Sequence, residues 1–362
     1  MLSEVDRTYM RRALEIAERG LYTTTPNPRV GCVLVRDGQI VGEGWHARAG
    51  EAHAEVIALR DAGERAVGAT AYVTLEPCAH HGRTPPCSEA LARARVARVV
   101  AAVADPNPLV AGKGFDVLRA AGIETESGLL EREAGELNVG FLSRMTRGRP
   151  WLRMKIAASL DGRTALANGR SQWITGPEAR RDGHHWRARS CAVLTGIGTV
   201  VEDDPQLTVR EVETSRQPVR VVVDSRLDIS PRARVLGHGT LIAAARDEAS
   251  RSGALRDRGA EVIVLPNASG KVDLAALIAE LGRRGINELH IEAGHKLNAS
   301  LLQADLVDEL LVYLAPRILG DTARGMFHLP ELTDLTQSRA LELRDVCTIG
   351  GDLRVMARVK AL

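Results

Sequence analysis

One histidine and two cysteines near the start of the chain have the types and the spacing of a metal site. His53-Ala54-Glu55 is followed by Pro77-Cys78, and Cys87 comes after eight further residues. An imidazole and two thiolates suit zinc, which takes nitrogen and sulfur ligands in a tetrahedral arrangement. Three protein ligands leave one position open, where a bound water has its pKa lowered towards about 7. We therefore expect His53, Cys78 and Cys87 to hold one catalytic zinc ion.

Glu55 follows the histidine by two residues and is the expected carrier of protons. The pattern H-x-E followed by P-C-x-x-C is typical of zinc-dependent base deaminases, in which the glutamate is not a ligand but transfers protons. In this chain eight residues, not two, separate the cysteines. A purely structural zinc site needs no proton carrier, so the presence of Glu55 favours an enzyme over a regulatory protein.

The alternative interpretation makes the cysteines ordinary core residues, because buried free cysteines are usually inert. Cys78 and Cys87 lie among Pro, Gly, His and Arg residues and not within an apolar strand. Cys87 also directly precedes a helix-forming segment, and a thiol at a helix N-terminus ionises more easily. These features favour metal binding, whereas we expect the other three cysteines to be core residues: Cys32, Cys191 and Cys347.

Short helices and strands must bring these side chains together. A β-strand is expected over 70–75, and Pro77 ends it just before Cys78. A helix is expected from His53 to Ala62, with His53 and Glu55 in its first turn, because residues two apart do not share a face in mid-helix. Strands and helices alternate in this half of the chain, which predicts a sheet with helices on its faces.

Length and composition limit the class of protein. A length of 362 residues predicts two domains at about 150 residues each. Hydrophobic residues make up 44% and charged residues 26%, which is ordinary for a globular enzyme. A formal net charge of +2 and an aromatic content of 3% provide neither the basic surface nor the stacking platform used to bind nucleic acids. We expect no nucleic-acid partner.

Cysteine usage and hydropathy predict a cytoplasmic location. The five cysteines show no disulfide framework, which indicates a reducing compartment. The first residues contain Glu4, Asp6 and Arg7 and lack the apolar core of a signal peptide. No apolar run approaches the roughly 18 residues that cross a bilayer, so we expect no membrane partner.

The first 145 or so residues resemble the cytidine-deaminase fold, a three-layer α/β architecture, and in particular the deaminase half of the bifunctional deaminase–reductases of riboflavin biosynthesis. The long segment between the two cysteines is typical of that family. The resemblance implies that Asn27, His46, His80 and Arg83 surround a pyrimidine and its ribose phosphate. It rests on these segments: Thr25-Pro26-Asn27-Pro28, Gly44-Trp45-His46, His53-Ala54-Glu55-Val56, Thr74-Leu75-Glu76-Pro77-Cys78, His81-Gly82-Arg83-Thr84-Pro85-Pro86-Cys87, Asp105-Pro106-Asn107-Pro108 and Gly112-Lys113-Gly114.

The second half resembles the reductase half of the same family, whose fold is similar to dihydrofolate reductase. Segment 131–149 is expected to form a helix that leads into Arg147-Gly148-Arg149-Pro150, and we place the domain boundary there, which gives a deaminase domain 1–146 and a reductase domain 147–362. The resemblance covers essentially the whole chain. In this half it rests on Trp151 to Ala158, Ser159-Leu160-Asp161-Gly162-Arg163, Ser171-Gln172-Trp173-Ile174-Thr175, Arg187-Ala188-Arg189-Ser190, Asp203 to Arg210 and Glu292-Ala293-Gly294.

Two glycine turns are candidates for binding a dinucleotide. Gly196-Ile197-Gly198 lacks the third glycine of the usual fingerprint and is a weak signal. Gly294 opens a helix whose free N–H groups would hold a pyrophosphate. Asp224-Ser225-Arg226 offers a hydroxyl and a guanidinium to a 2′-phosphate, which favours NADPH, although Arg226 is equally plausible as a surface charge. The resemblance places NADPH on Ala157, Trp173, Thr199, Asp203, Ser225, Gly294, His295, Lys296, Leu297, Asn298, Ala299 and Ser300.

Charged residues of the second half are the candidates for sugar and phosphate recognition. Lys155 and Glu292 are expected near the reacting sugar carbon, and Lys155, inside an apolar strand, should have a partner such as Glu292 or Asp161. A purely structural buried ion pair is the alternative. Arg187 and Arg210 are candidates for the substrate phosphate, because guanidinium matches phosphate geometry. The resemblance gives these substrate-binding residues: Ser171, Arg187, Leu207, Arg210 and Glu292.

The family resemblance implies two consecutive reactions on a pyrimidine ribotide. The first is zinc-dependent deamination of 2,5-diamino-6-(ribosylamino)-4(3H)-pyrimidinone 5′-phosphate, and the second is NADPH-dependent reduction of the ribosyl group of the product to ribityl. A nucleoside- or tRNA-editing deaminase with an accessory domain is the alternative function. We expect a homo-oligomer, either a dimer or a tetramer.

Overall fold

The structure is a computed structural model that describes residues 2–79, 85–107 and 111–360. The chain forms two compact units, Met1–Gly148 and Arg149–Leu362. The assignment of one reaction to each side of residue 146 stays a prediction. Among the described residues, no helix is long and apolar enough to cross a membrane.

The N-terminal unit contains a mixed sheet in the order β2-β1-β3-β4-β5. The first two strands form a hairpin around Asp37-Gly38, and both turn residues have positive φ. The other strands of the sheet run parallel to one another from β3 onward. The strands are β1 (Gly31–Arg36), β2 (Gln39–Trp45), β3 (Thr70–Val73), β4 (Arg98–Ala101) and β5 (Glu124–Ser127).

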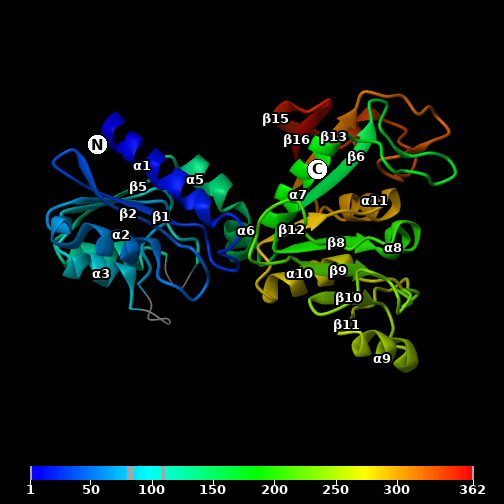
Figure 1. Cartoon of the computed structure of the whole chain (residues 1–362), viewed down its shortest axis with the longest axis horizontal. Helices are drawn as coiled ribbons and strands as arrows, with labels where there is room; N and C mark the ends of the chain where they lie inside the picture. The colour runs from blue at the N-terminus through cyan, green and yellow to red at the C-terminus, as the bar shows by residue number, and fades with distance from the viewer. Residues whose placement is uncertain (1, 80–84, 108–110, 361–362) are drawn as a thin grey trace. The chain divides into compact units, whose positions relative to one another are not determined.

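Helices cover both faces of this sheet, so the expected three-layer α/β architecture is confirmed (Figure 1). On one face, Met10 and Ile16 of α1 pack with Val33 of the sheet. On the other face, Ala58 of α2 and Leu91 of α3 pack with strand residues. The helices are α1 (Glu4–Ala17), α2 (Ala54–Ala62), α3 (Cys87–Arg93), α4 (Lys113–Ala120), α5 (Glu131–Leu137) and α6 (Val139–Arg147).

The C-terminal unit contains a larger sheet in the order β11-β10-β9-β8-β12-β6-β13-β16-β15. Its strands are parallel as far as β13, and the hairpin β15–β16 adds an antiparallel edge. The strands of this sheet are β6 (Trp151–Ser159), β8 (Ala192–Gly196), β9 (Val219–Val223), β10 (Thr240–Ala244), β11 (Ala260–Val264), β12 (Glu288–Ile291), β13 (Glu309–Ala315), β15 (Leu341–Ile349) and β16 (Asp352–Val359), while β7 (Arg163–Ala165) pairs separately with β14 (Arg324–Gly325).

Helices also cover both faces of the larger sheet. Leu277 of α10 and Leu301 of α11 pack on one face, and Ala179 of α7 and Leu255 of α9 pack on the other. Strand β12 lies between β8 and β6. From β8 the chain continues to β9 on one side, whereas from β12 it continues towards β13 on the other side. β8 and β12 therefore flank a topological switch point, where open α/β sheets bind ligands. The helices are α7 (Pro177–Arg189), α8 (Ile197–Asp203), α9 (Ala249–Asp257), α10 (Leu274–Arg283) and α11 (His295–Gln303).

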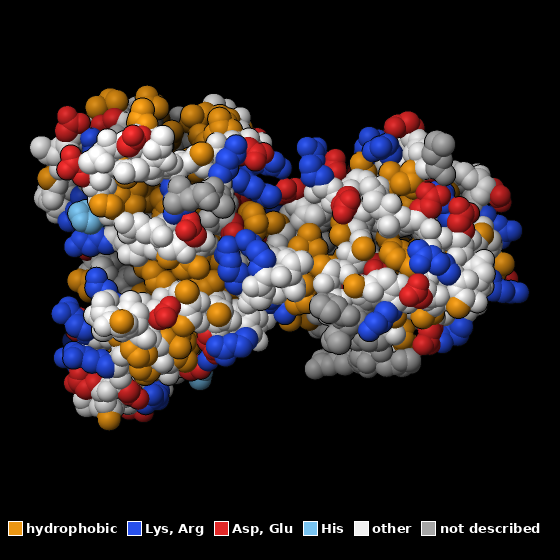
Figure 2. All heavy atoms as spheres, turned by 180° about the vertical axis from the view of Figure 1, so that it is seen from behind, with side chains coloured by type: hydrophobic (Ala, Val, Ile, Leu, Met, Phe, Trp, Pro, Cys, Tyr) orange, Lys and Arg blue, Asp and Glu red, His pale blue; other side chains and the backbone are white. Residues whose placement is uncertain are grey.

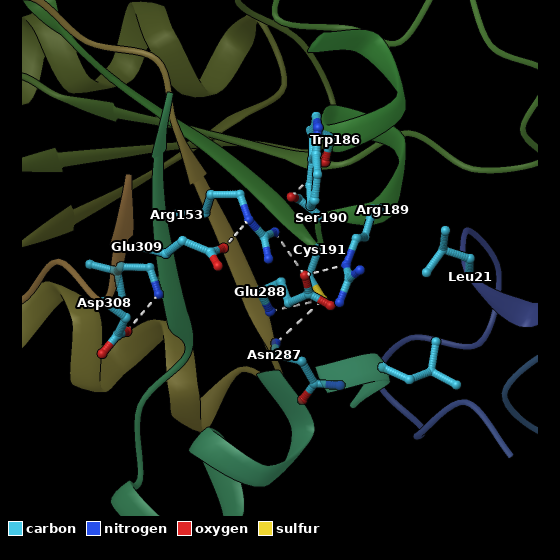
Figure 3. Close-up of polar contacts among 12 residues, drawn as sticks. Leu21, Arg153, Trp186, Arg189, Ser190, Cys191, Asn287, Glu288, Asp308 and Glu309 are labelled. Carbon is cyan, nitrogen blue, oxygen red and sulfur yellow. Dashed lines mark hydrogen bonds and ion pairs between the residues drawn. The ribbon is translucent and has the colours of Figure 1, made fainter. Parts of the chain in front are cut away.

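A network of four charges, three of them buried, connects the strands beneath α7 (Figure 3). Arg153 of β6 donates to Glu309 of β13 and to Glu288 of β12, and Arg189 of α7 donates to the same Glu288. Two guanidinium groups and two carboxylates balance one another, which a buried charge requires. The network therefore holds three strands and α7 in one register.

The outer surface carries charges of both signs. On the face drawn in Figure 2, Lys and Arg side chains lie interspersed with Asp and Glu side chains over both units. Apolar side chains are exposed on edge strand β15, where Leu341, Leu343 and Val346 are 45%, 65% and 50% exposed. Cys347 of the same strand is only partly buried, so the expectation that it is a core residue is wrong, whereas Cys32 and Cys191 are buried.

Each unit has its own hydrophobic core, which predicts that each folds alone. Fragments 1–148 and 149–362 both exceed the size at which a single domain buries an adequate core. In the second fragment, Arg149 forms a two-pronged ion pair with Asp308, which ties the first residue of the fragment to the segment before β13. We expect each purified fragment to unfold cooperatively and to keep one half-reaction. Circular dichroism and activity assays check this, and two unfolded fragments would contradict it.

Candidate functional sites

The start of helix α2 places the histidine and the glutamate. His53 is the N-cap residue, and the buried Glu55 lies in the first turn, as expected. The helix lies very close to strand β2, because a Cβ atom at Gly44 would lie 2.3 Å from the carbonyl oxygen of Ala54. Glycine at this position therefore allows the close approach that holds both side chains over the end of the sheet.

The two cysteines come from either side of the segment that contains residues 80–84. Cys78 follows the end of β3, and Cys87 is the first residue of α3. His53 Nδ1 lies 3.2 Å from Cys87 Sγ and 3.6 Å from Cys78 Sγ. Tetrahedral zinc with ordinary bond lengths separates its nitrogen and sulfur ligands by about 3.6 Å. All three ligand atoms lie within 4.8 Å of one another, so the donor set fits zinc.

The metal-ligand candidates and Glu55 shift one another's pKa values. Hydrogen bonds from Cys87 and His53 lower the pKa of the Cys78 thiol to about 4. The hydrogen bond to Cys78, together with burial, raises the pKa of Cys87. Burial raises the pKa of Glu55 to about 7, and the neighbouring Cys78 adds to this effect. Glu55 is therefore a buried carboxyl group able to exchange protons near neutral pH, and a bound metal ion would hold both cysteines as thiolates.

Two expected pyrimidine-binding residues lie next to the metal ligands. Asn27 Nδ2 lies 3.0 Å from His46 Nε2, and His46 Nδ1 lies 3.1 Å from the carbonyl oxygen of Ala52. The His46 ring meets the His53 ring edge-on, with centroids 5.3 Å apart. The carbonyl at Nδ1 and the amide at Nε2 favour the tautomer with its proton on Nδ1. The other two expected residues, His80 and Arg83, lie outside the described residues.

In the C-terminal unit, Arg187 and Glu292 form a two-pronged ion pair. Arg187 Nε and Nη2 donate to the two carboxylate oxygens of Glu292 at 2.8 and 2.9 Å. We expected Lys155 to pair with Glu292 or Asp161. Asp161 instead accepts from Ser159 and from the backbone of residues 319 and 320. Lys155 has no hydrogen-bond partner among the described residues, but the nearby Glu292 carboxylate is its electrostatic partner.

The electrostatics of this cluster centre on Glu292. Burial alone would raise its pKa, but Arg187 and Lys155 hold it well below its usual range. Burial lowers the pKa of Lys155, and Glu292 opposes this shift. Burial and the guanidinium groups of Arg187 and Arg234 also lower the pKa of Arg210. Several cations thus surround one carboxylate, an arrangement that favours binding of an anion.

Sequence reasoning missed His184, which the structure places in this cluster. The side chain is buried in α7, and its Nδ1 accepts the backbone N–H of Arg210 at 3.3 Å. Burial, Arg187 and Arg210 lower the pKa of His184 to about 4, so the ring is neutral at pH 7. No motif spacing marks a histidine in mid-helix, and only the fold brings it to Arg210.

Two helix N-termini meet at the switch point between β8 and β12. Gly196 caps α8 and Gly294 caps α11, and neither helix start has a side-chain cap. A Cβ atom at Gly294 would lie 3.7 Å from Thr199 Oγ1, so the two turns are adjacent. The buried Asn298 Oδ1 has no hydrogen-bond partner among the described residues. Free N–H groups and an unpaired carbonyl fit the pyrophosphate and amide groups of a dinucleotide.

The other expected cofactor and substrate residues are spread around these turns. Ala157 follows Lys155 on the same face of β6. Gln172, between Ser171 and the exposed Trp173, donates to Asp203 at 3.2 Å. Ser225 follows β9, and its hydroxyl accepts the N–H of Val272. The remaining residues lie in α11 or in the loop after α8: His295, Lys296, Leu297, Ala299, Ser300 and the buried Leu207.

Comparisons with known proteins match both units. Residues 3–103 match the family model of the cytidine and deoxycytidylate deaminase zinc-binding region, and residues 150–355 match the RibD C-terminal domain. The chain is 51% identical to the riboflavin biosynthesis protein RibD of Escherichia coli over 96% of this chain and 98% of the relative. It is 44% identical to the RibD protein of Aquifex aeolicus over 89% and 90% of the two chains.

Solved structures agree over the full length. Acinetobacter baumannii RibD superposes with a TM-score of 0.93 at 46% identity and covers 99% of each chain. A diaminohydroxyphosphoribosylaminopyrimidine deaminase/5-amino-6-(5-phosphoribosylamino)uracil reductase from Thermotoga maritima gives a TM-score of 0.88 at 33% identity, also over 99% of each chain. Both expected folds, deaminase-like and reductase-like, are confirmed by these matches.

Proposed function

Because the chain belongs to the RibD family of riboflavin biosynthesis proteins, we propose that its two units hold separate active sites for two consecutive reactions. The protein is a bifunctional enzyme that deaminates a diaminopyrimidinone ribotide and reduces the ribosyl group of the resulting aminouracil. Its cofactors are zinc and NADPH. One observation supports the two-site proposal, namely that two chemically different clusters lie in different units. The N-terminal unit contains a His/Cys/Cys cluster beside a buried glutamate. The C-terminal unit contains a Lys/Arg/Glu cluster beside two helix N-termini.

In the N-terminal site, His53, Cys78 and Cys87 hold zinc, which when bound supplies a Lewis acid that activates water at neutral pH. Glu55 lies beside these ligands without being one of them. It accepts a proton from the water and delivers a proton to the amino group that leaves as ammonia. Asn27 and His46 orient the pyrimidine, and their mutual contact fixes the direction in which each presents its polar atoms.

In the C-terminal site, the N-termini of α8 and α11 and the Asn298 amide hold NADPH, which supplies the hydride. Lys155 faces the opened sugar with an ammonium that donates a hydrogen bond to no carboxylate among the residues that the structure describes. Arg187 fixes Glu292 by two hydrogen bonds, so the carboxylate keeps its orientation beside Lys155. The pair therefore sets the charge around the carbon that receives the hydride.

Arg210 is the better candidate for the substrate phosphate, because Glu292 already occupies the Arg187 guanidinium. Among the described residues, Arg210 Nη1 donates only to uncharged oxygens of Gln206 and Thr208. A hydrogen bond to a charged group contributes about 1.5–3 kcal/mol. We expect Arg210→Ala to raise the KM for the phosphorylated aminouracil roughly 10- to 150-fold.

The dephosphorylated aminouracil nucleoside is the control for this variant. It offers Arg210 no charge, so its KM should hardly change, and deamination should be unaffected. Arg210→Lys should recover part of the loss, because an ammonium cannot make the two-pronged contact. Equal losses on both substrates would show that Arg210 is structural.

We also propose that the enzyme is a homo-oligomer, a dimer or a tetramer, located in the cytoplasm. The exposed apolar residues of β15 support the first part, because apolar side chains exposed along an edge strand favour association with another chain. Light scattering of the purified chain measures the oligomeric state, and a monomer would refute this part.

Ammonia release and NADPH oxidation test the proposed function directly. The diaminopyrimidinone ribotide should release ammonia without NADPH, and NADPH should be oxidised only when the deaminated product is present. An editing deaminase, the alternative function, would instead deaminate tRNA or free nucleosides and would oxidise no NADPH.

A further inference from the structure

Glu76 is a buried acidic residue close to the metal ligands that the mechanism above does not use. It lies two residues before Cys78 and is 3% exposed. Its carboxylate takes part in no ion pair among the described residues. A buried carboxylate without a cation requires several hydrogen-bond donors, and the donors that the structure places on it are backbone amides.

Three N–H groups donate to this carboxylate. Asp105 and Gly112 donate to Glu76 Oε2, each at 3.1 Å, and Gly114 donates to Oε1 at 3.0 Å. The last two amides belong to the N-terminus of α4, where a negative charge is favourable. Glu76 is thus bonded to both ends of segment 105–114.

Close packing strengthens this connection at the metal-binding turn. A Cβ atom at Gly114 would lie 2.0 Å from the carbonyl oxygen of Pro77, so the first turn of α4 lies directly against the backbone next to Cys78. On the other side, the backbone N–H and hydroxyl of Ser88 both donate to the Cys78 carbonyl. The Cys78 backbone is therefore held between α3 and α4. Glu76 is the side chain that connects this turn to α4 by hydrogen bonds.

We propose that Glu76 is a positioning residue of the deaminase site, which holds Asp105, the N-terminus of α4 and the backbone of Cys78 in one arrangement. The proposal rests on the proposed function insofar as Cys78 serves deamination. Glu76 acts through Cys78 and through the backbone, and it touches neither metal nor substrate. Its effect on turnover is therefore indirect.

The experiment compares full-length Glu76→Gln and Glu76→Ala with Glu64→Gln, which changes an exposed glutamate of the same unit. Glutamine keeps the shape but faces at least one N–H with an NH₂ group. The amides of Asp105, Gly112 and Gly114 should exchange hydrogen roughly 10- to 150-fold faster in Glu76→Gln, the equivalent of one lost charge-assisted hydrogen bond. Glu76→Ala should lose more protection, and Glu64→Gln should lose none.

Activity in the same chains separates positioning from general instability. Glu76→Gln should keep one zinc per chain, lower the kcat of deamination at least tenfold and leave reduction of supplied aminouracil unchanged. Unchanged exchange at 105–114 in Glu76→Gln, or equal losses of both activities, would overturn the proposal. Hydrogen exchange needs no substrate, so it decides the role of Glu76 even if the assigned substrate is wrong. If Glu76→Ala does not fold, the isosteric glutamine variant still gives the answer.

Discussion

Replacing Glu55 with glutamine is expected to slow deamination by about 10²–10⁴, the usual contribution of general acid–base catalysis. Glutamine preserves the size of the side chain and cannot accept or deliver a proton. The ligand atoms of His53, Cys78 and Cys87 are unchanged, so zinc content should stay at one per chain. Ammonia release under single-turnover conditions measures the effect.

The same variant contains its own control in the other unit. We propose that reduction of supplied aminouracil depends on residues such as Lys155 and Glu292, which belong to a unit with a different hydrophobic core. We expect that rate to be nearly that of the wild type. A Glu55→Gln enzyme that deaminates normally would refute the proton-carrier role.

Replacing Cys87 with serine is expected to remove both zinc and deamination. Changes to the groups that merely orient metal ligands cost roughly 10- to 100-fold in metal affinity, and loss of a ligand should cost more. Cys87 also interacts with the other ligands, because its Sγ lies 3.2 Å from His53 Nδ1 and its backbone N–H donates to Cys78 Sγ. Metal analysis after dialysis and an ammonia assay measure the two losses.

Cys347→Ser is the matched control for this substitution. It changes the same chemical group at a partly buried thiol in the C-terminal unit, which lies outside the metal cluster. Zinc and both activities should be retained. A Cys87→Ser enzyme that still deaminates without bound metal would contradict the zinc mechanism.

The metal site could be predicted from sequence because the donor chemistry is specific. His, Cys and Cys at this spacing suit few functions other than zinc, and Glu55 distinguishes a catalytic site from a structural one. The hairpin at Asp37-Gly38 was predictable for a similar reason, since both residues readily adopt positive φ. Local chemistry was sufficient in both cases.

Long-range partners were not predictable. The amides that bind Glu76 lie 29, 36 and 38 residues away in sequence. Every residue except proline has a backbone N–H group, so the residue types do not indicate which amides donate. The ion pair between Arg187 and Glu292 joins residues 105 positions apart, so residue types alone did not indicate that Arg187 binds a carboxylate of its own chain. Cys347 was expected in the core because a lone cysteine usually is buried, but its strand lies at the edge of the sheet.

Mixing two inactive variants tests the central claim of two independent sites most directly. Glu55→Gln should lack deamination only, and Lys155→Met should lack reduction only. Neither alone should convert the diaminopyrimidinone ribotide to the ribityl product in the presence of NADPH. Independent sites would let the intermediate leave one chain and bind another, so an equimolar mixture should form the ribitylaminouracil phosphate, identified by mass. A mixture that yields no ribityl product, although each variant retains its other half-reaction, would contradict the account.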